Sequence, residues 1–235
     1  MPPRKTFLIR HVRIEQPNEA NAARYLHVWH AGDLWNHPDT FPRITSEVLF
    51  GNGRPLEMEV GCSTGEYLCS LAQAAPDHNF LGVEINLKSL YLAVHNAATL
   101  GLDNILFIKV PIQSLYQLIP PNALSAVYMH FPDPYLHPKY RARRMFTTEF
   151  LDRMYVALVH GGKISIVTDK EELFWDMLAI MEHDPRFEKT HTERYLKGFE
   201  PRVKSRYQEY WERHDSTVYR FEVRKVGEGL VRRET

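Results

Sequence analysis

Pro55-Leu-Glu-Met-Glu-Val-Gly-Cys-Ser-Thr-Gly65 is a short, partly apolar run that ends in a glycine-containing turn, and the helical sequence Glu66-Tyr-Leu-Cys-Ser-Leu-Ala-Gln73 follows it. The run predicts a strand, because it is short and is bounded by proline and glycine. Phe80-Leu-Gly-Val-Glu84 predicts a second strand that ends on a carboxylate. A strand, a glycine turn, a helix and another strand are the beginning of a parallel α/β sheet.

The same alternation continues toward the C-terminus. Apolar residues at helical spacing predict helices over 87–100, 112–118, 146–160 and 171–182. Apolar and β-branched runs predict strands over 105–110, 123–129, 163–169, 187–190 and 217–223. Gly161-Gly162 predicts the C-cap of the helix before it. The sequence therefore predicts an α/β fold, with a mostly parallel sheet, helices on both faces and an antiparallel edge.

This pattern predicts one large domain over residues 55–225, followed by a short tail over 226–235. Residues 1–54 precede it as an N-terminal extension, which we expect to be partly ordered, with a short helix between Asn18 and Trp29. The extension is rich in tryptophan and histidine. Two roles stay open for these rings, a lid over a site or packing on the edge of the domain.

Composition limits the class of protein. The 235 residues are 44% hydrophobic, and 29 basic residues balance 29 acidic ones. No apolar run approaches the roughly 18 residues of a membrane span, and the N-terminus lacks the apolar core of a signal peptide. Cys62 and Cys69 have neither disulfide-framework nor metal-ligand spacing. We expect a cytoplasmic protein without a metal, in which any nucleic-acid binding comes from local basic clusters.

A first candidate site lies where the first two predicted strands end. Gly61 allows a ligand to approach the backbone, and Glu84 is placed to hold the two hydroxyls of a ribose. Glu59 would repel a pyrophosphate but suits an ammonium group, and Ser63 breaks the dinucleotide pattern G-x-G-x-x-G. A ligand with a ribose and a cationic amino-acid arm is S-adenosylmethionine. A nucleotide-phosphate site and a plain strand–turn–helix are the alternatives.

A second candidate site is His130-Phe-Pro-Asp-Pro-Tyr135, with the basic run Lys139-Tyr-Arg-Ala-Arg-Arg144 behind it. The two prolines predict that Phe131 and Asp133 are held extended just past a strand end. In an open α/β sheet, ligands bind outside the carboxyl ends of the strands. A fixed carboxylate followed by clustered cations predicts a site for an anionic partner. An ordinary turn with a solvated basic helix start is the alternative.

With both stretches in view, the chain resembles the bacterial tRNA (guanine-N7-)-methyltransferases over about Leu56 to Lys225. These are Rossmann-like enzymes that use S-adenosylmethionine to methylate a guanine in the variable loop of tRNA. The most specific matching piece is Phe-Pro-Asp-Pro-aromatic with its basic run, followed by the Gly-Gly strand and Thr168-Asp169. The resemblance implies a tRNA partner, no membrane, no metal, and a monomer or homodimer.

The resemblance also implies roles for single residues. Asp133 matches the catalytic carboxylate of the family. The residues that match cofactor contacts, or lie at their positions, are Glu59, Gly61, Gly65, Glu84, Ile112 and Asp133. The residues at substrate positions are His137, Lys139, Arg141, Arg143, Arg144, Asp169, Ser205 and Gln208.

Several of these positions depart from the family pattern. Pro111-Ile112 replaces an Asp-Ala or Asn-Ala pair whose side chain would hydrogen-bond the adenine, and His137 stands where a lysine is usual. The late Thr-Lys-aromatic-Glu motif is Ser205-Arg-Tyr-Gln208. These departures leave two alternatives open. The chain is a methyltransferase with another RNA or small-molecule substrate, or it is a non-catalytic RNA-binding relative. Asp169 can hold the guanine edge or cap the next helix, and the basic run can hold RNA phosphates or be a solvated face.

Overall fold

The computed structural model describes residues 14–198, 209 and 217–227. Its strands are β1 (Leu26–Val28), β2 (Leu56–Val60), β3 (Asn79–Glu84), β4 (Ile105–Lys109), β5 (Leu124–His130), β6 (Leu158–Thr168), β7 (Phe187–Lys189), β8 (Leu196–Lys197) and β9 (Tyr219–Lys225). Its helices are α1 (Glu19–Tyr25), α2 (Ala31–Asn36), α3 (Ser46–Phe50), α4 (Glu66–Ala74), α5 (Leu87–Thr99), α6 (Ile112–Leu115), α7 (Thr148–Ala157) and α8 (Glu171–Glu182). Short 3₁₀ helices are η2 (Pro38–Thr40), η3 (Tyr116–Leu118) and η4 (Pro138–Arg143).

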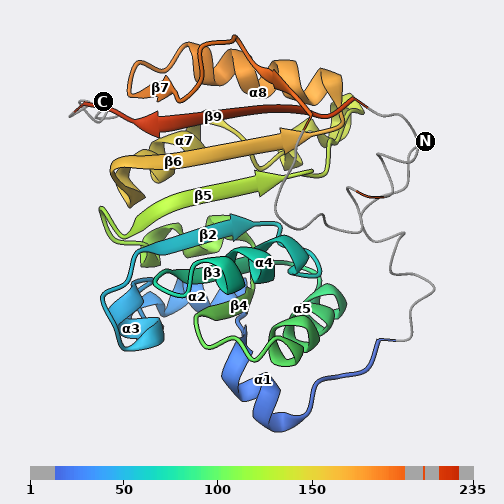
Figure 1. Cartoon of the computed structure of the whole chain (residues 1–235), viewed down its shortest axis with the longest axis vertical. Helices are drawn as coiled ribbons and strands as arrows, with labels where there is room; N and C mark the ends of the chain where they lie inside the picture. Colours follow the sequence, from blue (N-terminus) through green and yellow to red (C-terminus); the bar gives the residue numbers. More distant parts are fainter. Residues whose placement is uncertain (1–13, 199–208, 210–216, 228–235) are drawn as a thin grey trace.

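The strands form one sheet in the order β1-β4-β3-β2-β5-β6-β9-β7, with β8 paired to β9 (Figure 1). The pairs from β1 to β6 are parallel, whereas β9 runs antiparallel to both β6 and β7. This confirms the predicted mostly parallel sheet with an antiparallel edge. The order reverses between β2 and β5, so the carboxyl ends of these two strands border a crevice where α/β folds bind ligands.

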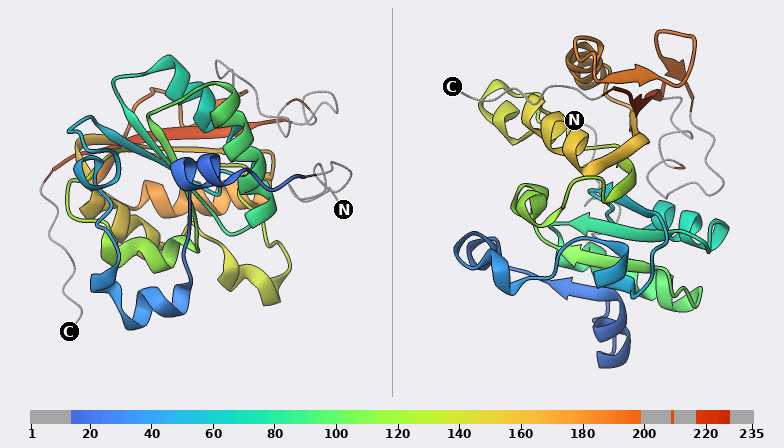
Figure 2. Two further views of the ribbon diagram at one scale, coloured as in Figure 1. Left: turned by 90° about the horizontal axis from the view of Figure 1, so that it is seen from below. Right: turned by 90° about the vertical axis from the view of Figure 1, so that its left-hand side faces the viewer.

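Two hydrophobic cores cover opposite faces of the sheet, because the central parallel strands are apolar on both sides. One core joins the sheet to α2, α6, α7 and α8. The other joins it to α1, α4 and α5. In the right-hand view of Figure 2, α4 and α5 lie on one side of the sheet and α7 lies on the other. Helices on both faces leave the strand ends as the open edge where ligands can enter.

The helix predicted over 146–160 is shorter than its apolar pattern suggested. It begins at Thr148, where the Thr147 hydroxyl accepts from the Phe150 N–H, and it ends at Ala157. Gly161-Gly162 is not a helix C-cap but part of β6, where the register against β5 shifts. Gly161 has φ +75°, and a Cβ on Gly162 would lie 2.9 Å from the carbonyl oxygen of Val159. Strand pairing with β5 and a bulge that needs glycine therefore overrode the helical pattern.

The part of the N-terminal extension that the structure describes packs against the domain and adds the edge strand β1 to its sheet. A helix does form between Asn18 and Trp29, as α1, and the short edge strand β1 that follows it was not predicted. The Trp29 ring is buried in the core, and the backbone N–H of Trp29 donates to the carbonyl of Lys109. Packing on the domain edge is therefore the role of Trp29, whereas Trp35 is exposed. The division of the chain at residue 54 stays a prediction.

Gly65 offers a test of how the first turn is packed. Its φ is +68°, and an added Cβ would lie 2.8 Å from the Cβ of Ala93. Gly101 has a similar φ of +63° with open space around it. We expect Gly101→Ala to cost about 1–2 kcal/mol from backbone strain. Gly65→Ala should cost about 1–3 kcal/mol more from the clash, as measured by urea unfolding. Equal losses would contradict this close packing.

Candidate functional site

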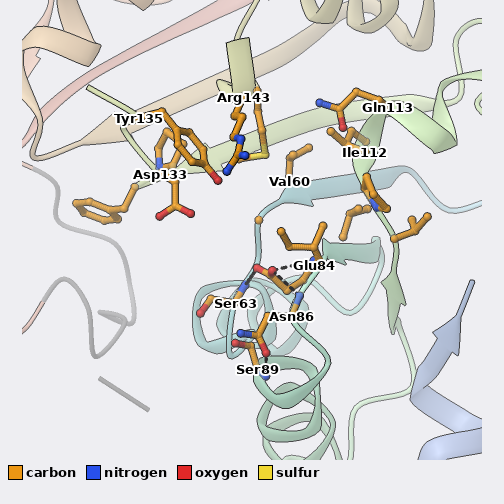
Figure 3. Close-up of a pocket in the computed structure, with 18 residues that line it drawn as sticks. Val60, Ser63, Glu84, Asn86, Ser89, Ile112, Gln113, Asp133, Tyr135 and Arg143 are labelled. Atoms are coloured by element: carbon orange, nitrogen blue, oxygen red, sulfur yellow. Dashed lines mark hydrogen bonds between the residues drawn. The ribbon is translucent and has the colours of Figure 1, made fainter. Parts of the chain in front are cut away.

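A cavity of about 380 Å³ lies at the carboxyl ends of β2, β3, β4 and β5 (Figure 3). Its position is the edge that the strand order predicts for a ligand. Its volume lies in the range of small-molecule sites, which is roughly 300–1,000 Å³. The lining residues are Val60, Gly61, Ser63, Val83, Glu84, Ile85, Asn86, Ser89, Val110, Pro111, Ile112, Gln113, Phe131, Pro132, Asp133, Tyr135, Arg143 and Met145.

The Glu84 carboxylate is fixed in this cavity by the backbone. Its Oε2 accepts from the Ser63 N–H at 3.1 Å. Its Oε1 accepts from the N–H groups of Ile85 and Asn86, at 2.8 and 2.9 Å. A carboxylate offers about four lone-pair sites, so acceptor capacity remains for the hydroxyls of a ligand. Glu84 thus lines the cavity, in an orientation set by the glycine turn and by the start of α5.

The two glycines of the first turn have different surroundings. Gly61 lines the cavity with φ +77°, and an added Cβ would contact the Met145 methyl at 3.5 Å. Gly65 does not line the cavity, since it is buried against Ala93 and Phe107. Its conformation and packing place the start of α4, so its effect on a ligand is indirect.

Glu59 is buried and is not among the residues that line the cavity. Its strand neighbours Met58 and Val60 belong to the core on the α7 face. Burial, with the charge of Glu59 as a smaller cause, raises the pKa of Cys69 to about 12. Cys69 is therefore a protonated, buried thiol, as expected of an incidental cysteine. A contact between Glu59 and the cofactor stays a prediction.

The Asp133 turn differs from its predicted backbone in one respect. Phe131 is not extended but has φ +50°, and Tyr135 has φ +40°. The Phe131 ring is buried with Val167 and Val218, and its N–H donates to the Val167 carbonyl at 2.6 Å. This burial selected the left-handed region over the extended one that a following proline favours. Such residues cost about 1–3 kcal/mol each and persist only where the surroundings hold them.

Asp133 is exposed at the cavity wall, and Figure 3 shows its carboxylate pointing into the space above Ser63. Tyr135 and Arg143 lie beside it on the same wall. The cavity thus has the Asp133 carboxylate on one wall and the Glu84 carboxylate on another. The sequence had predicted that Glu84 and Asp133 share one edge of the sheet, and the structure brings them to one cavity.

Pro111, Ile112 and Gln113 line the part of the cavity beyond the end of β4. The sequence analysis named Ile112 but missed Gln113, an exposed carboxamide that can both donate and accept hydrogen bonds. It also missed Asn86, which caps α5 by accepting from the N–H groups of Lys88 and Ser89. Asn86 and Gln113 lie two and three residues past the ends of predicted strands, and that position was the available signal for finding them.

The basic run forms η4 and divides into cations with different partners. Lys139 and Arg143 lie over the Tyr140 ring, at 4.7 and 5.0 Å from its centre, and both residues are exposed. Arg141 pairs with Glu172 of α8 at 2.8 Å, and its side chain is 53% exposed. Arg144 pairs with Asp176 of α8 at 2.5 Å, and its side chain is only 11% exposed. His137 caps η4, because its Nδ1 accepts from the Lys139 N–H.

Asp169 follows the end of β6 on the same edge of the sheet, but it is not among the cavity residues. Its side chain is 2% exposed and pairs with Lys170. The residue at the N-cap position of α8 is Lys170, without a side-chain capping bond. This weakens the helix-cap alternative for Asp169. Ser205 and Gln208 lie outside the described residues.

The cavity fits the expected cofactor at two points. Glu84 supplies a charged acceptor for ribose hydroxyls, and the apolar residues Val83, Ile85, Val110 and Ile112 suit the faces of an adenine. Over the described ranges, no cluster of three or more metal-ligating side chains occurs and no helix is long and apolar enough to cross a membrane. The residues that would hold S-adenosylmethionine are those of the cavity, at the carboxyl ends of β2, β3, β4 and β5.

Solved structures share this fold. An antibiotic-related methyltransferase aligns with a TM-score of 0.54 at 14% identity, covering 74% of this chain and 88% of that one. TrmN from Thermus thermophilus aligns with a TM-score of 0.53 at 17% identity, covering 83% of this chain and 48% of that one. At such identities the likeness establishes the methyltransferase fold alone.

Sequence relatives are much closer. The pattern of a family described as putative methyltransferase matches residues 53–221. A tRNA (guanine-N(7)-)-methyltransferase from Rubrobacter xylanophilus is 46% identical, covering 90% of this chain and 95% of that protein. One from Chloroherpeton thalassium is 37% identical, covering 89% and 93%. The chain therefore belongs to the family of S-adenosylmethionine-dependent tRNA (guanine-N7-)-methyltransferases.

Proposed function

We propose that this protein transfers a methyl group from S-adenosylmethionine to N7 of a guanine in the variable loop of tRNA. The observation that carries the proposal is the cavity at the point where the strand order reverses, between β2 and β5. In this cavity Asp133 faces the wall that holds Glu84. One carboxylate is placed for a ribose and the other for the reacting base. A soluble RNA substrate agrees with action in the cytoplasm, and the oligomeric state, monomer or homodimer, stays a prediction.

The cofactor half of the site rests on Glu84 and Gly61. Three backbone N–H groups hold the Glu84 carboxylate, so little reorganisation is needed when it binds hydroxyl groups. Gly61 leaves the backbone open at the end of β2. Bound S-adenosylmethionine supplies an electrophilic methyl group on its sulfonium. Gln113 is placed to bind polar adenine atoms in the region where the family's Asp-Ala pair is Pro111-Ile112.

The proposed reaction does not require the protein to remove a proton from the substrate. Guanine N7 carries a lone pair and no proton, so methylation there needs no general base. The protein must hold N7 in line with the methyl group, and positioning of this kind can supply roughly 7–11 kcal/mol. Positive charge develops on the purine, and the Asp133 carboxylate is a fixed partner for it. We therefore expect no loss of activity that traces to a base titrating near neutral pH.

The RNA half of the site rests on the exposed cations of η4. Arg143 lines the cavity wall that carries Asp133, and Lys139 and Arg143 both lie over the ring of Tyr140. Phosphate contacts of this kind fix the position of a nucleic acid. His137 and Arg141 are exposed residues next to the same run, and we propose that they contact the tRNA near the target guanine. A contact from the buried side chain of Asp169 stays a prediction of the family resemblance.

The test is to map methylation of tRNA taken from a strain that lacks this modification. Borohydride–aniline cleavage breaks the chain at N7-methylguanine and therefore reports the site. Cleavage at one variable-loop guanine supports the proposal, whereas methyl transfer to another atom or RNA indicates a changed substrate. S-adenosylmethionine binding without any transfer, measured by calorimetry, indicates a non-catalytic relative.

The RNA contacts give a salt-dependence prediction. If Lys139 and Arg143 contact phosphates, replacing both with Gln should weaken tRNA binding. It should also lower the slope of log Kd against log salt by roughly 1.4–1.8, because fewer counterions are released. Filter binding at several salt concentrations measures this slope. Arg54→Gln, an exposed cation before β2 at the opposite edge of the sheet, is the control. A wild-type slope in the double variant would mean that this face is merely solvated.

A further inference from the structure

The turn that carries Asp133 has strained residues on both sides of the carboxylate. Phe131 and Tyr135 both have positive φ, at +50° and +40°. Pro132 and Pro134 have no N–H, so they cannot donate to a neighbouring strand. A strained turn with so few backbone donors keeps one shape only if other groups hold it.

One side of the turn is held by the sheet. The Phe131 N–H donates to the Val167 carbonyl at the end of β6, and the Phe131 ring is buried against Val167 and Val218. This anchor lies before Asp133 in the chain. The residues after Asp133 lie on the other side of the turn, toward α8.

One contact after Asp133 is made by Arg144. Its Nε donates to the Pro134 carbonyl oxygen at 3.0 Å, and its Nη1 donates to Asp176 Oδ2 at 2.5 Å. One planar guanidinium therefore joins the Asp133 turn to α8. Arginine suits this task because its donors have a fixed geometry, whereas lysine has a single ammonium group.

Arg144 differs in exposure from the other cations of the run. Its side chain is 11% exposed, compared with 53% for that of Arg141 in the same run. A phosphate reaches an exposed guanidinium easily. To reach Arg144 it would have to displace both a backbone carbonyl and a carboxylate.

We propose that Arg144 is a positioning residue, which holds the Asp133 turn against α8 through Pro134 and Asp176, and not one of the cations that contact RNA. The inference rests on the proposed function for its kinetic effect. In this arrangement the exposed cations of the basic run bind tRNA, and the one buried cation keeps the Asp133 carboxylate in place.

The test compares charge with geometry at this position. Arg144→Lys keeps the charge but has all its donors on one nitrogen, so it cannot reproduce the bonds that Nε and Nη1 make separately to Pro134 and Asp176. Both Arg144→Lys and Arg144→Gln should lower the single-turnover methylation rate at saturating tRNA by about tenfold to a hundredfold, as small misplacements do. Their tRNA affinity and salt slope should stay within twofold of wild type. Arg54→Gln is the control for rate, and Arg141→Gln should weaken tRNA binding.

A near-wild-type rate for Arg144→Lys, together with weaker tRNA binding by Arg144→Gln, would overturn the proposal and return Arg144 to the RNA contacts. Asp176→Asn removes the α8 carboxylate from a side chain that is 46% exposed, so this variant tests the link even if Arg144→Gln fails to fold. It should slow methylation in the same direction. An unchanged rate in this variant would also count against the proposal.

Amide hydrogen exchange makes the test independent of the reaction. Exchange at Asp133 and Tyr135 should speed up in Arg144→Lys and Asp176→Asn, because the turn loses an anchor. If exchange is faster in the variants but the wild-type protein does not methylate tRNA, the anchor is supported and the proposed function is rejected. Unchanged exchange in both variants, with an active wild-type protein, would reject the anchor alone.

Discussion

Asp133→Asn should lower the single-turnover rate of tRNA methylation by about 10²–10³, the usual loss when one preorganised electrostatic partner is removed. The substitution keeps the shape of the side chain and removes its charge. Asp133 is exposed at the cavity wall, so the fold should be unaffected. S-adenosylmethionine should still bind with much of its affinity, because Glu84 and the ends of the other strands are unchanged.

The measurement is a rapid-quench assay with enzyme in excess over tRNA, so that product release does not limit the rate. Asp103→Asn serves as the matched control, since Asp103 is exposed and precedes the start of β4, at the opposite edge of the sheet. Near-wild-type rates for Asp133→Asn would reduce Asp133 to a turn residue. The assignment to N7 would then rest on family membership alone.

Glu84→Ala is expected to weaken S-adenosylmethionine binding by roughly 10- to 150-fold. The two ribose hydroxyls would lose a charged acceptor, and hydrogen bonds to charged groups contribute about 1.5–3 kcal/mol. The structure adds a second cause. The alanine leaves the N–H groups of Ser63, Ile85 and Asn86 without the carboxylate that now orients them. The cavity wall should therefore loosen where the ribose binds.

Isothermal titration with S-adenosylmethionine measures the loss, and thermal unfolding checks that the variant is folded. Glu84→Gln is the graded control, because it keeps one acceptor oxygen in the same place. Its affinity should lie between those of wild type and Glu84→Ala. Unchanged affinity in a folded Glu84→Ala protein would remove Glu84 from the cofactor site.

Local sequence signals were sufficient for most of the sheet. The strand from Leu56 to Val60 and the helix from Glu171 to Glu182 have apolar spacing and boundary residues that agree with their tertiary environment. Such agreement makes local prediction reliable. The prediction was wrong near Gly161, because strand pairing is a contact with a distant segment and leaves no mark on helical spacing. The short strands β1 and β8 were missed for the same reason.

The sequence by itself determined the order of the central strands and helices, and with it the edge of the sheet at which Glu84 and Asp133 lie. Strand ends in a parallel sheet share one edge whatever the side chains do. Only the tertiary structure decided that Gly65 packs inside the protein, that Phe131 is left-handed, and that Arg144 faces Asp176. The basic run looks uniform as a sequence, because charge is a property of each residue. The carboxylates that pair with Arg141 and Arg144 lie on α8, so the folding of the chain alone determines which cations of the run are buried and which remain exposed.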